Sequence, residues 1–105
     1  MPASQPIEVR QTAEFHDWLR TLQDKTAAAR IASRIVRIQS GLLGDAKPVG
    51  EGVSELRIDH GPGYRLYFTQ HGAVLIILLC GGDKGTQRSD ITKARALAAA
   101  MEIGT

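Results

Sequence analysis

The stretch VSELRIDHGPGYRLYF, residues 53–68, decides the fold of this chain. Every second side chain in its two halves is apolar, with Leu56 and Ile58 in the first half and Leu66 and Phe68 in the second. This period of two is typical of half-buried antiparallel strands, whose successive side chains point to opposite faces. The segment HGPG, residues 60–63, supplies turn residues between the halves. The stretch therefore predicts a β-hairpin with one apolar face.

Further strand and loop signals flank this hairpin. His71 and Gly72 predict a second, tighter turn into the apolar run 74–80, which we interpret as a central strand buried on both faces. Residues 7–11 predict a short first strand. Residues 45–52, which contain Pro48 and two glycines, predict an irregular connection before the hairpin.

Three other segments repeat their apolar residues at intervals of three and four, which predicts amphipathic helices. The expected N-caps are Thr12 for the first helix, Thr26 for the second, and Ser89 or Asp90 for the last. The apolar stripes are Phe15, Trp18, Leu19 and Leu22, then Ala28, Ile31, Ile35, Ile38 and Leu42, and finally Ile91, Ala94, Leu97, Ala98 and Met101. The predicted order is β-α-α-β-β-β-α, which is an α+β fold.

Length and composition limit the classes of protein that remain. The 105 residues suit one compact domain, so we expect a single domain over residues 1–105 with a flexible tail at residues 1–6. Cys80 is the only cysteine, which excludes an intrachain disulfide and a cysteine-based metal site and favours a reducing cytoplasm. The longest apolar run, residues 73–80, is too short to span a membrane. We expect no membrane association, no metal and no small-molecule cofactor.

Charged residues are expected to gather at one end of the sheet. If helices cover the apolar face of the hairpin, Arg57, Arg65 and Tyr67 share the other face, provided that the hairpin loop has an odd length or a bulge. Antiparallel pairing returns Asp83 and Lys84 to the same end. One rim is then predicted to gather Arg57, Arg65, Lys84, Asp59 and His60.

This rim carries the groups that cleavage of RNA by its own 2′-hydroxyl requires. The reaction needs a proton acceptor, a proton donor and cations that stabilise a negatively charged phosphorane. Arg57, Arg65 and Lys84 supply the cations. The candidates for proton transfer, which the sequence does not rank, are His60, Asp59, Asp83, Tyr64 and Tyr67. The alternative interpretation is that the strand arginines pair with Glu55 and Asp59 on a solvated sheet face.

A second basic cluster lies on the predicted second helix. Arg30, Arg34 and Arg37 form a stripe beside its apolar residues, and Lys47 follows in the next segment. The net charge is only +2, but such a local concentration fits an RNA or acidic-protein partner; a solvated helix face is the alternative. A two-histidine ribonuclease site is excluded, because His60 and the histidine of the second turn lie at opposite ends of one strand, roughly 20 Å apart.

Several strings together resemble the RelE/ParE superfamily of toxins, and specifically its HigB-like addiction-module killer proteins. These strings are FHDWL (15–19), RIASRI (30–35), GDAKPVG (44–50), GVSELRI (52–58), GPGYRLYF (61–68) and GGDKGTQ (81–87). The resemblance implies two helices and a C-terminal helix packed on a curved antiparallel sheet. It also implies a toxin of a type II toxin–antitoxin system whose partner is a small cognate antitoxin.

For activity, the resemblance implies cleavage of messenger RNA in the ribosomal A site. The positions that match the family's functional basic residues are Arg57, Arg65 and Lys84, with Lys47 a weaker match. The general acid and base vary between members, and this chain has Asp83 and Lys84 followed by a helix in place of RelE's terminal arginine pair and late tyrosine. ParE-like members share the fold but inhibit DNA gyrase without being nucleases, so that non-enzymatic function is the alternative.

Overall fold

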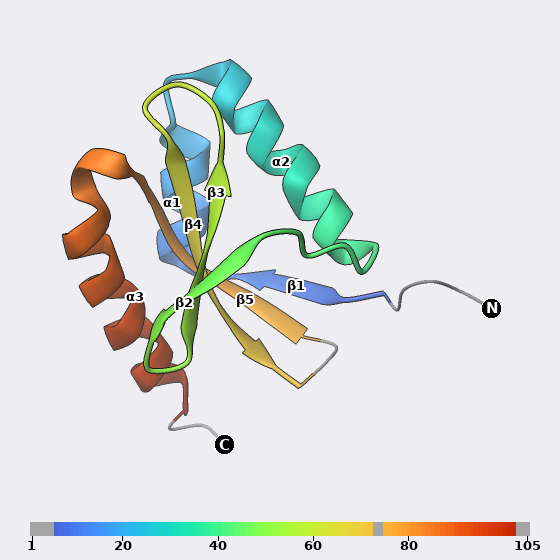
Figure 1. Cartoon of the computed structure of the whole chain (residues 1–105), viewed down its shortest axis with the longest axis vertical. Helices are drawn as coiled ribbons and strands as arrows, with labels where there is room; N and C mark the ends of the chain where they lie inside the picture. The colour runs from blue at the N-terminus through green and yellow to red at the C-terminus, as the bar shows by residue number, and fades with distance from the viewer. Residues whose placement is uncertain (1–5, 73–74, 103–105) are drawn as a thin grey trace.

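The computed structural model describes residues 6–72 and 75–102 of the chain, which form a five-stranded sheet flanked by helices (Figure 1). The strands are β1 (Glu8–Gln11), β2 (Ala46–Gly50), β3 (Val53–Ile58), β4 (Tyr64–His71) and β5 (Leu75–Asp83). The helices are α1 (Ala13–Thr21), α2 (Lys25–Gln39) and α3 (Gln87–Glu102), and a 3-10 turn, η1 (Lys84–Thr86), precedes α3. The predicted α+β class is confirmed. Residues 1–5 of the predicted tail lie outside the described residues.

The predicted hairpin is β3 and β4, and its register is the one that the apolar pattern requires. Leu56 lies opposite Leu66, so the apolar residues of both strands share one face. The loop of residues 59–63 has an odd length, as that register demands. Within it, Gly61 and Gly63 have φ values of 58° and 86°, which only glycine adopts without strain.

The structure corrects the predicted order, because a further strand, β2, follows α2. Residues 46–50 pair antiparallel with β3 instead of forming an irregular connection. The sequence hides this strand because β2 lies at the sheet edge, where Pro48 needs no hydrogen-bonding partner on its outer side. Its side chains are largely exposed, so no apolar alternation marks it. The order is therefore β-α-α-β-β-β-β-α.

The sheet is also mixed rather than wholly antiparallel. Its strand order is β1-β5-β4-β3-β2, and β1 pairs with β5 in the parallel sense while every other pair is antiparallel. Parallel pairing needs a long crossover connection. The chain makes it here by way of both helices and three intervening strands, a long-range arrangement that no local pattern indicates.

Two apolar cores lie on opposite faces of the sheet, with α2 and α3 on either side of the strands (Figure 1). The first core packs α1 and α2 against the predicted apolar face; its members include Phe15, Ile31, Ile38, Leu56, Tyr64, Leu66, Phe68 and Leu78. The second core packs α3 against the other face and contains Val53, Tyr67, Leu79, Cys80, Ala94 and Ala98. The central strand β4 is buried over six consecutive residues because helices cover both of its faces.

A β-bulge in β5 changes which face its last residues meet. Tyr67 lies opposite Cys80 but Phe68 lies opposite Leu78, so Leu79 is the extra residue. Leu79 and Cys80 therefore both pack into the α3 core. The backbone carbonyl of Leu79 accepts a hydrogen bond of 2.6 Å from the hydroxyl of Thr12, the N-cap of α1.

The helix caps agree with the sequence at α1 and differ at the other two helices. Thr12 caps α1 as predicted, through a bond from the backbone N–H of Phe15. Asp24 caps α2 in place of Thr26, because its carboxylate accepts from the N–H of Ala27. The predicted cap at Ser89 or Asp90 is wrong, because both residues lie inside α3, which begins at Gln87 directly after η1. Asp83 is the N-cap of η1.

Candidate functional site

Two arginines on the α3 side of the hairpin form the centre of the candidate site. Arg57 and Arg65 lie directly opposite each other in the register of β3 and β4. Both approach the carboxylate of Glu55, with Nε–Oε distances of 3.5 Å from Arg57 and 3.6 Å from Arg65. The Arg65 side chain is 8% exposed, whereas that of Arg57 is 62% exposed. One guanidinium is thus embedded as support and the other is open to a ligand.

Glu55 is central to the site, although the sequence marked it only as an ion-pair partner of the strand arginines. Its side chain is 1% exposed and also accepts a 3.2 Å hydrogen bond from the amide nitrogen of Gln87 in α3. The pairing of strand arginines with Glu55 is therefore correct, but the expectation of a solvated sheet face is wrong there, because α3 covers it. The sequence signal for Glu55 is its position in β3, because it shares one face of the strand with the buried Val53 and with Arg57.

The predicted rim of cations is present. Arg57, Arg65 and Lys84 line one hollow of about 260 Å³ together with Asp59 and Tyr64. Lys84 reaches it because η1 begins where β5 ends, beside the first residue of β4. The odd-length loop and antiparallel pairing that the sequence indicated bring these groups together.

The helix stripe joins this rim, which the sequence did not predict. Arg30, Arg34 and Arg37 line a hollow of about 250 Å³ with Asp59. Arg34 also lines a hollow of about 590 Å³ with Lys47, Arg57 and Asp59, and donates a 3.4 Å hydrogen bond to the carbonyl of Arg57. The two predicted clusters therefore form one surface, here called the basic surface, made of Arg30, Arg34, Arg37, Lys47, Arg57, Arg65 and Lys84.

Asp59 is the carboxylate at the junction of this surface. It lines all three hollows and is exposed. Within residues 6–72 and 75–102 its carboxylate makes no hydrogen bond or ion pair, unlike Glu55 beneath the arginines. It is an available proton acceptor beside several cations.

Three other predicted candidates for proton transfer point elsewhere. His60 turns toward α2, where its Nε2 lies 3.3 Å from the carboxylate of Asp24. The hydroxyl of Tyr67 is buried and has no hydrogen-bond partner in the part of the chain that the structure describes. Burial, reinforced by the Glu55 carboxylate, raises the pKa of Tyr67 above its ordinary value. The Asp83 carboxylate accepts from the N–H of Gly85. None of these three groups lines the hollow of the basic rim.

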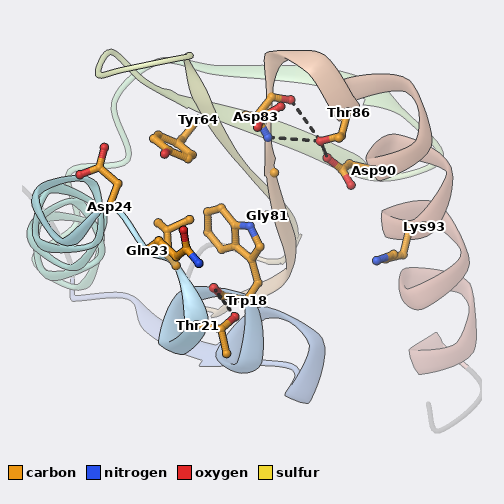
Figure 2. Close-up of a pocket in the computed structure, with 12 residues that line it drawn as sticks. Trp18, Thr21, Gln23, Asp24, Tyr64, Gly81, Asp83, Thr86, Asp90 and Lys93 are labelled. Carbon is orange, nitrogen blue, oxygen red and sulfur yellow. Dashed lines mark hydrogen bonds between the residues drawn. The ribbon is translucent and has the colours of Figure 1, made fainter.

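A larger hollow of about 740 Å³ lies beyond Tyr64, between α1 and the beginning of α3 (Figure 2). The hollow is lined by the aromatic rings of Trp18 and Tyr64 and by the polar side chains of Thr21, Gln23, Asp24, Asp83, Thr86, Asp90 and Lys93. The described residues include no group of three or more histidine, cysteine, aspartate or glutamate side chains placed to hold a metal ion. They also include no helix with the length and apolar character that crossing a bilayer requires.

Comparison with known proteins identifies relatives over most of the chain. Residues 17–102 match the family described as "Phage derived protein Gp49-like (DUF891)". A protein of Haemophilus influenzae, named only as uncharacterized, is 50% identical over 98 residues, which are 93% of this chain and 97% of that protein.

Two solved structures are similar in fold. The E. coli toxin RelE, as a double arginine-to-alanine mutant in the free state, matches with a TM-score of 0.69 at 14% identity, over 88% of this chain and 96% of RelE. A chain of the toxin–antitoxin complex RelBE2 from Mycobacterium tuberculosis matches with a TM-score of 0.58 at 18% identity, over 77% of this chain and 97% of that one. The chain therefore has a RelE-like fold, as the sequence resemblance implied.

Proposed function

The chain belongs to the phage-derived Gp49-like family, and from that premise we propose that it is the toxin of a type II toxin–antitoxin module that cleaves messenger RNA on the ribosome. The observation that carries the proposal is the basic surface, which brings seven cationic side chains together although the net charge of the chain is only +2. Such a concentration binds the phosphates of a polyanion and makes that binding sensitive to salt.

The proposed reaction is attack of an RNA 2′-hydroxyl on the adjacent phosphate. Asp59 accepts the proton of the hydroxyl, the 2′-oxygen forms a bond to phosphorus, and the bond from phosphorus to the 5′-oxygen breaks. Lys84 donates a proton to that leaving oxygen, and the products carry a 2′,3′-cyclic phosphate and a 5′-hydroxyl. Arg57 stabilises the charge that builds on the phosphorane, while Arg65 and Glu55 hold its guanidinium in place. No metal or cofactor takes part.

The rest of the basic surface is proposed to bind the ribosome and the flanking RNA. Arg30, Arg34 and Arg37 project from α2 beside the cleavage rim, and Lys47 lies on the edge strand β2. Because this surface is continuous, one strand of RNA can contact the helix and the rim at once. The protein would act in the cytoplasm, where translation takes place.

The proposed protein partner is a cognate antitoxin, which would hold the toxin inactive while the cell grows. RelBE2 is a toxin–antitoxin complex of similar fold, which supports a partner of this kind here. An acidic antitoxin segment would neutralise the basic surface. Val36 and Leu42, the large apolar side chains that the described residues leave exposed, are 59% and 54% exposed beside the arginine stripe and offer that segment an apolar contact.

The deciding experiment is brief expression of the native chain and of Arg57→Ala in cells that lack the antitoxin, followed by mapping of messenger RNA 5′ ends within translated frames. Arg57 is preferred to Arg65 because its side chain is exposed, so its loss leaves the fold intact. Arg20→Ala, a change of an exposed arginine on α1 outside the basic surface, is the matched control.

We expect translation-dependent cuts with the native chain and the control, and a loss of about 100-fold with Arg57→Ala. Intact messenger RNA accompanied by DNA breaks would contradict this proposal. That result would favour the ParE-like alternative, a non-enzymatic inhibitor of DNA gyrase.

A further inference from the structure

The hollow beyond Tyr64 adjoins the basic surface and differs from it in chemistry. Tyr64 lines both this hollow of about 740 Å³ and the hollow of the basic rim, which Arg57, Arg65 and Lys84 also line. It lies opposite Asp83 in the register of β4 and β5, and Lys84 follows. A ligand that holds a phosphate on the rim therefore has this hollow within reach of its next chemical group.

Two aromatic rings form the apolar wall of the hollow. The ring centroids of Trp18 and Tyr64 lie 6.3 Å apart with an interplanar angle of 61° (Figure 2). Trp18 also contacts Phe15, at 5.7 Å between ring centroids. A Cβ on Gly81 would lie 2.3 Å from the indole, so this glycine lets the ring rest on the strand. The wall is thus a fixed aromatic platform rather than a gap between mobile side chains.

The polar lining is rich in hydrogen-bond acceptors. Asp83 and Asp90 each use one carboxylate oxygen within the fold, for the N–H of Gly85 and the hydroxyl of Thr86. The Asp83 carboxylate also accepts from the backbone N–H of Thr86 in the capping box of η1. The other carboxylate oxygen of Asp90 and the side-chain amide of Gln23 have no partner among the described residues. Asp24 adds further negative charge to the lining.

The only cation of the lining does not balance these carboxylates. The ammonium of Lys93 lies 3.7 Å from the carboxylate of Glu14 and is already engaged. The hollow therefore repels a phosphate group and attracts a flat group that donates hydrogen bonds.

We propose that this hollow is a nucleobase subsite, which takes one unstacked base of the RNA whose phosphate lies on the basic rim. An extruded base stacks on Trp18, whose ring is half-buried, as unpaired bases do on aromatic side chains in RNA-binding proteins. Tyr64, which is 8% exposed, supports the Trp18 ring from its edge. The amide oxygen of Gln23 and the free carboxylate oxygen of Asp90 accept from the exocyclic amino group of guanine, adenine or cytosine. Uracil has no exocyclic amino group and can donate only from its ring N3–H, so the subsite binds uracil more weakly. The inference rests on the proposed RNA-cleaving function and assigns that function a base preference.

Trp18 makes the subsite directly measurable, because it is the only tryptophan of the chain. Its indole N–H gives a single NMR signal, and its fluorescence reports on the hollow alone. We would titrate the full-length chain with GMP, AMP, CMP and UMP, and follow that indole signal. A labelled single-stranded RNA of mixed sequence, followed by anisotropy, reports separately on the basic surface.

The informative variant is Gln23→Ala, and its matched control is Gln70→Ala. Gln70 is an exposed glutamine near the other end of β4, paired with Ile76 and away from the hollow. We expect GMP, AMP and CMP to shift the indole signal with affinities at least about tenfold tighter than UMP. Gln23→Ala should weaken this response, whereas Gln70→Ala should leave both this response and the RNA anisotropy unchanged.

The outcomes separate this inference from the proposed function. RNA binding that is lost in Arg57→Ala but leaves the indole unmoved overturns the subsite and retains the basic surface. Equal responses to UMP and to the other nucleotides also overturn it. An indole shift caused by the antitoxin alone makes the hollow a protein interface and refutes the subsite. Absence of RNA binding in every assay defeats both proposals together.

Discussion

Arg57 lies directly opposite Arg65 across the β3–β4 hairpin, so two guanidinium groups occupy neighbouring positions on one face of the sheet. Like charges in this relationship destabilise a strand pair. The buried carboxylate of Glu55 offsets the repulsion, since it lies within 3.6 Å of Nε in both arginines. Without Glu55, the repulsion between the two guanidinium groups would destabilise the pairing of β3 with β4.

Glu55→Gln tests this dependence. The substitution leaves Arg65 buried without a counter-charge, and breaking a buried ion pair costs about 3 kcal/mol. We expect a loss of that order in the free energy of unfolding by urea denaturation, and a further loss of cleavage activity at temperatures where the variant is folded. The double variant Glu55→Gln/Arg65→Leu should recover part of the stability but not the activity. A stability within 0.5 kcal/mol of the native chain, a limit of about the size of a surface substitution, would show that the ion pair is not needed.

The basic surface predicts a defined salt dependence. Arg30→Glu/Arg37→Glu should weaken binding to ribosomes and single-stranded RNA without changing the melting temperature by more than a few degrees, because both side chains are exposed. The slope of log affinity against log salt should fall by about two, one for each lost phosphate contact. Arg20→Glu, an exposed arginine outside the surface, is the charge-matched control. Unchanged affinity in the double variant would show that the exposed arginines of α2 do not contact RNA or the ribosome.

The contact of Asp24 with His60 predicts a pH-dependent contribution to stability. The N–H of Ala27, and secondarily His60, lower the pKa of Asp24 below its ordinary value. The fold therefore favours the deprotonated carboxylate, and the stability that it contributes is complete above the ordinary pKa of about 4 and is lost as the pH falls through the lowered value. The melting temperature of Asp24→Asn should lie below that of the native chain at pH 7. The two melting temperatures should converge as the pH falls through the lowered pKa of Asp24. A difference that stays constant as the pH is lowered would contradict the assignment.

Cys80 should be chemically inert in the folded protein. Burial, with the Asp90 carboxylate as a second cause, raises the pKa of the Cys80 thiol to about 12. At pH 7 almost no thiolate is present, and the side chain is 3% exposed. Thiol-labelling reagents should react only as fast as the protein unfolds, and guanidinium chloride should restore full reactivity. Rapid labelling under native conditions would show that α3 opens from the sheet.

Gly81→Ala should strain the aromatic wall. The added Cβ would lie 2.3 Å from the Trp18 ring, so the ring or the strand must move. Overpacking of this kind costs about 1–3 kcal/mol. Differential scanning calorimetry should show the loss, whereas Gly85→Ala, with its nearest contact at 3.2 Å to a carboxylate oxygen, should have a smaller effect. Near-native stability of Gly81→Ala would mean that Trp18 has room to shift.

The features that the sequence predicted are those with a local periodic signal. Alternation in residues 53–68 determined the hairpin, its odd-length loop and the common face of Arg57 and Arg65, because successive strand residues point to opposite sides. Antiparallel pairing then placed Lys84 at the same end. The cap at Thr12 was equally accessible, since one hydroxyl before an amphipathic stripe is a local pattern.

Only the tertiary structure decided the remaining features, because each depends on which distant segment covers which face. The placement of α3 over the second face buries Glu55 between the arginines. The docking of α2 brings Arg34 to Arg57 and joins the two basic clusters. The edge strand β2 and the extra residue in β5 lie in pairings with neighbouring strands, β3 and β4, but no apolar alternation in the sequence marks either of them. A sequence pattern records how one segment alternates; contacts between segments are chosen by the packing of the whole fold, and that choice made one surface from two stripes of charge.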